Sequence, residues 1–486
     1  MSFEVNLPTG GGVVAAYPPK DVTGIKASGG NTKIMLNWSD PTDTVGDDGT
    51  TFVKWKGTKV VRKLGAYPVN ERDGVQIIDN QVRDAYKTTA FVDTGLTNDQ
   101  TYYYGFFPYS EENAYNRNEV NRITGVPTSY KIYGVRIDTT NSNPETALTY
   151  TDDAVGMQAK SDLWDEFFGI YPCLFKNGAE VGKLNKNNFA QFEDGTSADI
   201  TSGSAGDVMI AFPRRGLKIT TTGNYIDIKM TDDPNNGDFD YLAHTRGSVS
   251  KDVFYLGAYK GVVSSNKLRS LSGSSPTVST TLTNFRTYAQ ANGSGYELSC
   301  FHQLTYRQAM YILKYKNLNS QAALGKGYTG GSAKQSTGAT NTKGMDYGST
   351  SSSTERVKLF GIEDFWGNIW EWVDGMFCNS SRHILTGTDS FNNSATGYTD
   401  QGQAATGDLS GYLSKVQGTS GMGFLPKVCG GSSSTYHSDY AGLYAGYFAG
   451  FGGGWGNGDN AGAFCIYVNY SASNSYSDLG ARLMYL

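Results

Sequence analysis

The sequence predicts two folded domains, an all-β sandwich followed by a larger α+β domain. At 486 residues the chain is too long for one core of ordinary size. Charged residues make up only 18% of it, while 61 glycines and 33 tyrosines favour strands and loops over long solvated helices. Short strand patterns fill the first quarter, and a helical pattern first stands out beyond residue 300.

Residues 1–20 are rich in Gly and Pro and lack any hydrophobic periodicity. Such a segment orders only against a partner, so we expect an N-terminal arm used for attachment or for oligomer contact. It also lacks the basic start and apolar stretch of a secretory signal, so synthesis in the cytoplasm is expected. No window of about 18 apolar residues occurs, which argues against membrane insertion.

The net charge of −5 and the absence of a run of five Lys or Arg residues argue against a nucleic-acid partner. The five cysteines are Cys173, Cys300, Cys378, Cys429 and Cys465, and none of them forms a CxxC pair. We therefore expect neither a metal site nor a disulfide framework, and interpret these residues as small buried hydrophobes.

Residues 21–128 carry strand patterns at regular spacing, in KIMLNW (33–38), FVKWKGTKVVRK (52–63) and TYYYGFFPY (101–109). In the first of these, Ile34, Leu36 and Trp38 alternate with polar residues, which is typical of a strand with one buried face. Several such strands predict a β-sandwich.

The stretch FVDTGLTNDQTYYYGF (91–106) resembles the end of a fibronectin type III domain. Leu96 stands six residues before Tyr102, as in a tyrosine corner. The resemblance implies that Trp38 is the buried core tryptophan, and that the domain serves as a spacer or docking module.

Residues 129–486 form the second predicted domain. Strands are expected at 208–213, 216–220 and 225–230, the last two joined by a turn at Gly223-Asn224. A helix is expected to begin at Thr305 with a capping box to Gln308 and to bury one apolar face. The Gly/Ser-rich segments after residue 326 read as surface loops, with few regular elements in the C-terminal third.

The segment GIEDFWGNIWEWVDG (361–375) holds three tryptophans and four carboxylates in fifteen residues. It resembles the GN(I/V)WEW motif of the C-type-lectin-like fold, found in formylglycine-generating-enzyme relatives and in variable proteins of diversity-generating retroelements. The resemblance implies a structural role. Trp366, Trp370 and Trp372 would form the floor under a binding face, while Asn368 and Glu371 satisfy loop backbone groups.

The C-terminal run 452–486 resembles the end of those variable proteins and of related phage tail proteins, and 304–328 is a further matching block. The invariant frame would comprise Gly453, Gly454, Trp455, Asn460, Ala461, Gly462, Leu479, Gly480, Ala481 and Arg482. The resemblance implies a homotrimeric tail-tip protein of the virion that contacts other tail proteins and a bacterial host surface receptor, protein or glycan. The resemblance also suggests that a reverse transcriptase could diversify this region, and the sequence leaves that question open.

The region 434–478 is the predicted binding surface, because Tyr gives large contact area and Ser, Gly and Asn give adaptable hydrogen bonds. From 464 to 470 one alternating set of side chains should face the core and the other solvent, and the pattern leaves open which. The expected contact residues are Tyr436, His437, Tyr440, Tyr444, Tyr447, Trp455, Asn457, Tyr467, Asn469, Tyr470, Ser475 and Tyr476.

No catalytic residue and no cofactor are assigned. The copper oxidases of this fold need two nearby thiolates, whereas Cys429 and Cys465 stand 36 residues apart and match no such pair. The acidic segment 231–240 lacks the closing Glu of a calcium loop and is interpreted as a turn. Two alternatives stay open, a hydrolase of host-surface polysaccharide and a structural tail spacer, because paired carboxylates for glycoside cleavage need no local motif.

Overall fold

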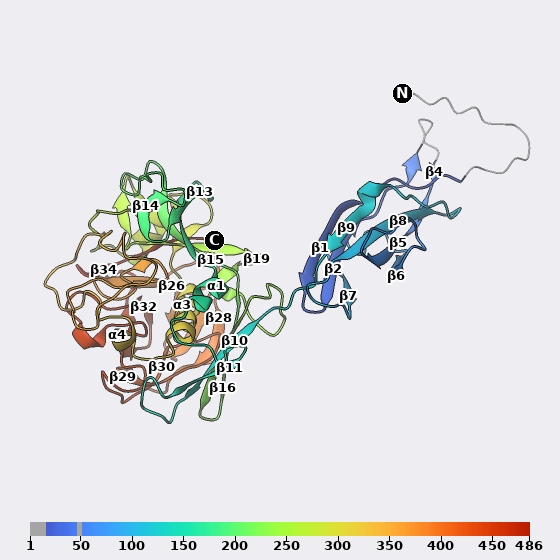
Figure 1. Ribbon diagram of the computed structural model, residues 1–486. Coiled ribbons are helices and arrows are strands. Elements are labelled where there is room, and N and C mark those ends of the chain that lie inside the picture. Colours follow the sequence, from blue (N-terminus) through green and yellow to red (C-terminus); the bar gives the residue numbers. More distant parts are fainter. Residues whose placement is uncertain (1–15, 46–50) are drawn as a thin grey trace, which may run out of the picture. The chain divides into compact units, whose positions relative to one another are not determined.

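The computed structural model describes residues 16–45 and 51–486, which divide into two compact units (Figure 1), Met1–Tyr130 and Lys131–Leu486. The division lies next to the expected boundary at 128/129. Of the expected arm, residues 1–15 lie outside the described part, and 16–20 carry neither helix nor strand.

The first unit contains two main antiparallel sheets. The strands of the three-stranded sheet are, in order, β1 (Thr23–Gly30), β2 (Lys33–Ser39) and β7 (Phe91–Thr94). Those of the four-stranded sheet are β6 (Val75–Asn80), β5 (Trp55–Leu64), β8 (Tyr102–Ser110) and β9 (Arg122–Gly125), while β3 (Thr44–Val45) and β4 (Thr51–Val53) pair separately.

The core of the first unit lies between these sheets. Ile34, Leu36 and Trp38 of β2 are buried together with Tyr104 and Phe106 of β8. The ring of Trp38 contacts that of Phe106 at 5.2 Å, and its indole N–H donates to Asp40 at 2.9 Å. The expectation that Trp38 is a core residue is therefore confirmed.

The corner residue Tyr102 is also buried. Its hydroxyl accepts a hydrogen bond from the backbone N–H of Thr97 at 3.0 Å, next to Leu96. This bond fastens the start of β8 to the preceding turn, as the sequence pattern predicted.

The second unit is predominantly β, with strands in three large sheets. In order, the four-stranded sheet contains β11 (Leu148–Asp152), β10 (Ile132–Asp138), β17 (Tyr225–Thr231) and β16 (Gly216–Thr222). The seven-stranded sheet contains β14 (Asn188–Phe192), β13 (Ala179–Asn185), β12 (Tyr171–Lys176), β15 (Asp207–Pro213), β20 (Val253–Gly257), β35 (Leu483–Tyr485) and β23 (Tyr296–Leu298). The strands expected at 208–213, 216–220 and 225–230 are thus confirmed as β15, β16 and β17.

The C-terminal third forms a nine-stranded sheet, which corrects the expectation of few regular elements there. Its order is β28 (Thr399–Gln403), β27 (His383–Thr386), β26 (Trp370–Cys378), β32 (Tyr447–Phe451), β33 (Ile466–Tyr470), β31 (Tyr440–Leu443), β29 (Leu409–Val416) and β30 (Pro426–Cys429), with β34 (Leu479–Gly480) beside β26. Two-stranded ribbons are β18–β19 (Thr245–Arg246, Val249–Ser250), β21–β22 (Val262–Ser264, Lys267–Arg269) and β24–β25 (Lys358–Leu359, Ile362–Glu363). Glycine-rich strands escape sequence patterns because they lack alternating large apolar residues.

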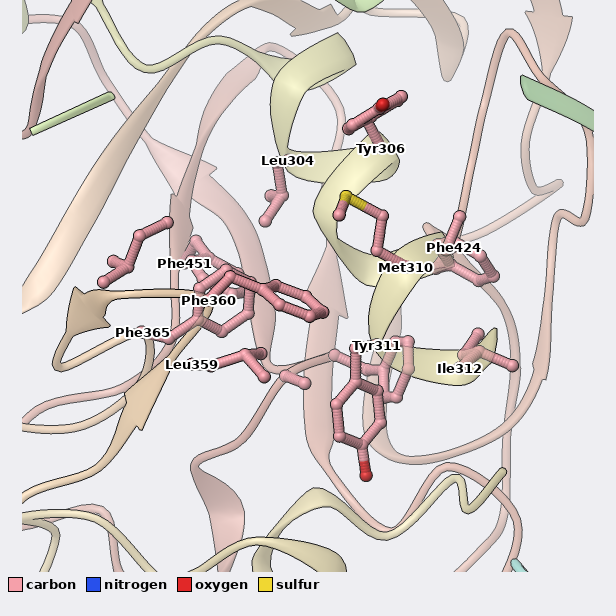
Figure 2. Packing of buried hydrophobic residues seen from close by; sticks show 14 of the residues in the cluster. Leu304, Tyr306, Met310, Tyr311, Ile312, Leu359, Phe360, Phe365, Phe424 and Phe451 are labelled. Carbon is pink, nitrogen blue, oxygen red and sulfur yellow. The ribbon is translucent and has the colours of Figure 1, made fainter. Parts of the chain in front are cut away.

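Four α-helices complete the described part of this unit, α1 (Asp162–Phe168), α2 (Leu282–Gln290), α3 (Phe301–Tyr315) and α4 (Ser320–Ala323). Helix α3 begins at Phe301 and not at Thr305, and all fifteen of its residues are buried. The capping box is therefore wrong, because Gln308 instead donates to the carbonyl of Ala463 at 2.8 Å. Figure 2 shows apolar side chains surrounding the helix, which explains why it buries more than one face.

The two faces of the nine-stranded sheet contribute to different cores. Val373, Ala449 and Val468 belong to the core that contains α3. Trp370 and Trp372 point the other way, into a core shared with α2. The sheet is therefore covered on both faces around β26.

A buried ion cluster ties distant segments of this unit together. The carboxylate of Glu371 accepts from the guanidinium of Arg482 at 2.9 Å and from the ammonium of Lys260 at 3.2 Å. Arg482 also donates to the carbonyls of Gly257 and Glu363. Burial alone would raise the pKa of Glu371, but the neighbouring cations lower it to about 2. The expectation that Glu371 satisfies loop backbone groups is wrong, because its partners are side-chain cations.

Asn368 does satisfy loop backbone, as expected. Its side-chain carbonyl accepts from the N–H of Gln335 at 2.8 Å, and its amide donates back to the carbonyl of Gln335 at 3.1 Å.

We expect Arg482→Met to lower the free energy of unfolding of the second unit by about 3–5 kcal/mol, because a buried carboxylate loses its closest cation. Arg136→Met is the matched control, since its ion pair with Asp227 lies on the surface and should contribute at most about 1 kcal/mol. Calorimetric melting of the full chain measures both. Equal losses in the two variants would contradict a dominant role for the buried cluster.

Candidate functional site

Four tyrosines gather on three neighbouring strands of the nine-stranded sheet. Tyr412 of β29 pairs with Tyr440 of β31, and their rings meet edge to face at 5.3 Å. Tyr440 stacks on Tyr467 of β33, with ring centroids 5.9 Å apart and planes 11° from parallel. Tyr444 follows β31 on the same face, beside Gly442. All four residues are half-buried, and we call them the tyrosine face.

A bulge in β33 decides which side chains point outward. Ile466 and Val468 are buried, whereas Tyr467 between them is half-buried and Asn469 is exposed, so the row containing Tyr467 is the one that reaches the surface. The register against β32 shifts between Phe448 and Ala449, which leaves Asn469 as an extra residue. Tyr470 is thereby turned to the same face as Tyr467.

Trp370 and Trp372 of β26 lie on the same face of the sheet as these tyrosines, and their buried rings, called the tryptophan floor below, pack against them from the side of β26. The ring of Trp370 contacts Tyr467 at 5.3 Å, and that of Trp372 contacts Tyr470 at 5.6 Å. Tyr476, half of whose surface is exposed, packs against Tyr470 at 5.9 Å. Anchoring by buried tryptophans holds the tyrosines in place before any partner arrives.

Trp366 does not belong to this floor. It packs in the core that contains α3, and its indole N–H donates to the carbonyl of Gly325 at 3.2 Å. The expected role of Trp366 beneath the binding face is therefore corrected.

Two glycines make room for the rings. A β-carbon on Gly450 would stand 2.6 Å from Cε2 of Tyr470, and one on Gly442 would stand 3.1 Å from Cε2 of Tyr444. Only glycine lets the aromatic rings lie this close to the strands. Burial raises the pKa of Tyr467 and of Tyr470, so both phenols stay neutral and can donate as well as accept hydrogen bonds.

A polar pocket of about 210 Å³ adjoins the tyrosine face. Its lining residues are Asn319, Gln321, Ala322, Lys326, Thr350, Ser433, Ser438 and Asp459. Burial, followed by the nearby charge of the lining residue Asp459, raises the pKa of Tyr412. The surface thus combines broad aromatic contact area with a polar hollow at its edge.

Three of the expected contact residues lie apart from the tyrosine face. His437 is buried against Phe464, with ring centroids 5.0 Å apart, and burial lowers its pKa to about 3. It cannot reach a partner in this conformation, so the expected contact is wrong. Tyr436 is half-buried, and its backbone N–H donates to the carbonyl of Ser142. Tyr447 is exposed at the start of β32, where it pairs with Cys378 of β26.

The remaining expected residues have mixed positions. Asn469 and Ser475 are exposed, next in sequence to Tyr470 and Tyr476. Asn457 accepts from the N–H of Gly454 at 2.7 Å and so closes a turn beside the half-buried Trp455.

Tyr412 was missed because it precedes the tyrosine-rich region in sequence. The apolar residues of LSGYLSKV (409–416) have helical and not strand spacing, so no local signal identified this strand, and only the sheet order shows that it lies beside β31.

No group of three or more His, Cys, Asp or Glu side chains within 16–45 and 51–486 could hold a metal ion. In the acidic segment, Asp233 and Asn236 each accept from a backbone N–H two residues on, as turn residues do. No helix in the described part of the chain is long and apolar enough to cross a membrane. Of the five cysteines, Cys429 is half-buried and the others are buried.

Neither a protein-family model nor a curated protein matches the sequence. Among solved structures, the chain is similar to the Major Tropism Determinant P3c variant, at 13% identity, over 94% of this chain and 81% of that one, with a TM-score of 0.21. Similarity to the U1 variant is 12% in identity, over 87% of this chain and 95% of that one, with a TM-score of 0.23. TM-scores this low do not establish a shared fold, so the tyrosine face itself has to support a function.

We expect Gly450→Ala to lower stability by about 1–3 kcal/mol, because the new methyl group would push Tyr470 off its tryptophan floor. Gly456→Ala is the matched control, since a β-carbon there meets open space. Thermal melting measures stability, and tryptophan fluorescence reports the displaced ring. If both variants melt alike and keep the same fluorescence, the close approach at Gly450 is unimportant.

Proposed function

We propose that this chain is a receptor-binding protein of a phage tail tip and that its tyrosine face recognises a bacterial host surface receptor, protein or glycan. One observation carries the proposal, the unbroken ring contacts from Tyr412 through Tyr440 to Tyr467, all of which are half-buried and so keep part of their surface accessible. Clusters of accessible aromatic rings mark interaction sites, because a partner that covers them removes apolar surface from water and so gains binding free energy.

The chemistry of the face suits protein or glycan recognition. Each tyrosine offers an apolar ring and a hydroxyl at the cost of few torsions, and packing against Trp370 or a neighbouring tyrosine has already restricted several of them. The one acidic residue between 434 and 455, Asp439, is buried, so no exposed carboxylate from that segment interrupts the surface. Binding, with no catalytic step, is the function that this arrangement supports.

The proposal also covers the role of the first unit and the oligomeric assembly of the chain. We infer that residues 21–128 are a fibronectin type III-like spacer, supported by the two sheets and by the bond between Thr97 and Tyr102. The sequence resemblance supports a C-type-lectin-like second domain in a virion-borne homotrimer that docks onto other tail proteins. Diversification by a retroelement would act on side chains of the tyrosine face while the tryptophan floor stays constant.

The test uses labelled full-length protein and bacteria that the phage infects. We expect the double variant Tyr440→Ala, Tyr467→Ala to weaken binding to cells by at least about tenfold, because it removes the two stacked rings at the centre of the face. Tyr225→Ala is the matched control, since it removes an exposed tyrosine from another sheet of the same unit. Flow cytometry measures binding, and circular dichroism confirms that each variant is folded.

Three outcomes would overturn the proposal. Unchanged binding by the folded double variant would move recognition elsewhere. Failure of the wild-type protein to bind cells or to block adsorption would favour a structural tail spacer. Release of oligosaccharides from host polysaccharide would indicate a hydrolase.

A further inference from the structure

A second cleft lies at the other end of the nine-stranded sheet, beside the β27–β28 hairpin. Strands β26 and β32 separate this hairpin from β33 and the tyrosine face. The cleft encloses about 380 Å³, within the range typical of small-ligand sites. It is lined by Leu242, Gly247, His302, Thr386, Gly387, Thr388, Asp389, Ser390, Thr396, Gly397, Thr399 and Gln401.

His302 contributes an unpartnered polar group to this cleft. The side chain is 4% exposed and lines the cleft, yet it makes no hydrogen bond to any residue in the described ranges. A ring held by its surroundings without a protein partner is available to a ligand that enters the cleft. Since burial lowers the pKa of His302 to about 4, the ring is neutral near pH 7 and presents one donor and one acceptor.

The rim adds further polar groups without partners. Thr388, which is half-buried, and the exposed residues Asp389, Ser390 and Thr399 also line the cleft, and none of their side chains makes a hydrogen bond within the described structure. Hydroxyls and a neutral imidazole can each donate and accept, which matches the hydroxyl groups of a ligand.

The charge of the lining narrows the class of ligand. Asp389 is the one charged residue among the lining residues named above, and none of them is Lys or Arg. An anionic ligand would meet the carboxylate of Asp389, while the neighbouring cation Arg246, which donates to the carbonyl of Thr388, already pairs with Glu297. Leu242 is the one large aliphatic side chain among the lining residues. A neutral molecule with several hydroxyl groups avoids repulsion by Asp389 and can form hydrogen bonds with the polar lining residues.

Contacts within the protein fix the loop that borders the cleft before any ligand binds. Phe391, which is buried, anchors the loop between the two strands beside Gly375, where a β-carbon would stand 2.8 Å from the phenyl ring. Asn392 accepts from the backbone N–H groups of Ser394 and Thr396 and so closes the loop on itself. Gln401 donates to Thr386 across the hairpin at 2.8 Å. Such fastening reduces the entropy lost when a ligand binds.

We propose that this cleft binds a neutral saccharide, with the imidazole of His302 at its floor and the carboxylate of Asp389 at its rim. The site is independent of the tyrosine face and would let the protein hold a surface glycan while the tyrosine face engages its own target. The occupant is identified by its chemistry, a pyranose-sized ligand rich in hydroxyl groups and without charge.

The test probes full-length protein with an array of neutral hexoses, deoxyhexoses and N-acetylhexosamines, with sialic and uronic acids as the charged set. We expect binding within the neutral set, verified by saturation-transfer NMR. Thr399→Trp should weaken it by at least about tenfold, because the indole fills the mouth of the cleft. His302→Phe should weaken it while keeping an aromatic ring in place. Thr220→Trp is the matched control, since Thr220 is an exposed strand threonine outside the cleft.

The outcomes separate this proposal from that for the tyrosine face. Absence of binding to every neutral saccharide, preference for the charged set, or full binding by folded Thr399→Trp would each overturn it. The double variant Tyr440→Ala, Tyr467→Ala should keep saccharide binding, and its loss there would assign the sugar to the tyrosine face instead. Melting temperatures of Thr399→Trp and Thr220→Trp identify any variant that fails to fold.

Discussion

The second unit depends on the buried ion cluster of Glu371, Arg482 and Lys260. These residues come from three segments that lie far apart in the sequence, and the guanidinium of Arg482 also satisfies the carbonyls of Gly257 and Glu363. Desolvating such charges is costly, so the cluster is favourable only while all of its partners are present. It therefore specifies one arrangement of the segments more than it adds raw stability.

The tyrosine face is a consequence of that arrangement. Glu371 lies between Trp370 and Trp372 on β26, so holding its carboxylate on one side of the strand turns both indole rings to the other. The rings then support Tyr467 and Tyr470. Beyond the core that contains α2, the row of aromatic rings continues from Tyr467 to Tyr440 and Tyr412 at the surface. Buried scaffold and exposed contact area are thus two parts of one aromatic layer.

Burial also explains why two expectations about polar residues failed. His437 stands in a segment crowded with Tyr, Ser and Gly, which suggested a surface loop, yet it packs against Phe464 in the core. Thr305 and Gln308 have the spacing of a helix cap, but α3 already begins at Phe301, so both residues lie inside the helix. In each case a long-range contact decided the position, and local composition carried no information about that contact.

By itself the sequence determined the core position of Trp38, strands β15 to β17 and the buried tryptophan motif, because alternation and aromatic density are local properties. It also located much of the tyrosine face, through the tyrosines after residue 434. Only the tertiary structure decided that Tyr412 joins that face, that Trp366 does not underlie it and that Glu371 pairs with cations. It likewise brought His302 to the β27–β28 hairpin. Strand order, a single-residue bulge and the partners of a buried charge arise from contacts between distant segments, and no window of the sequence contains both sides of such a contact.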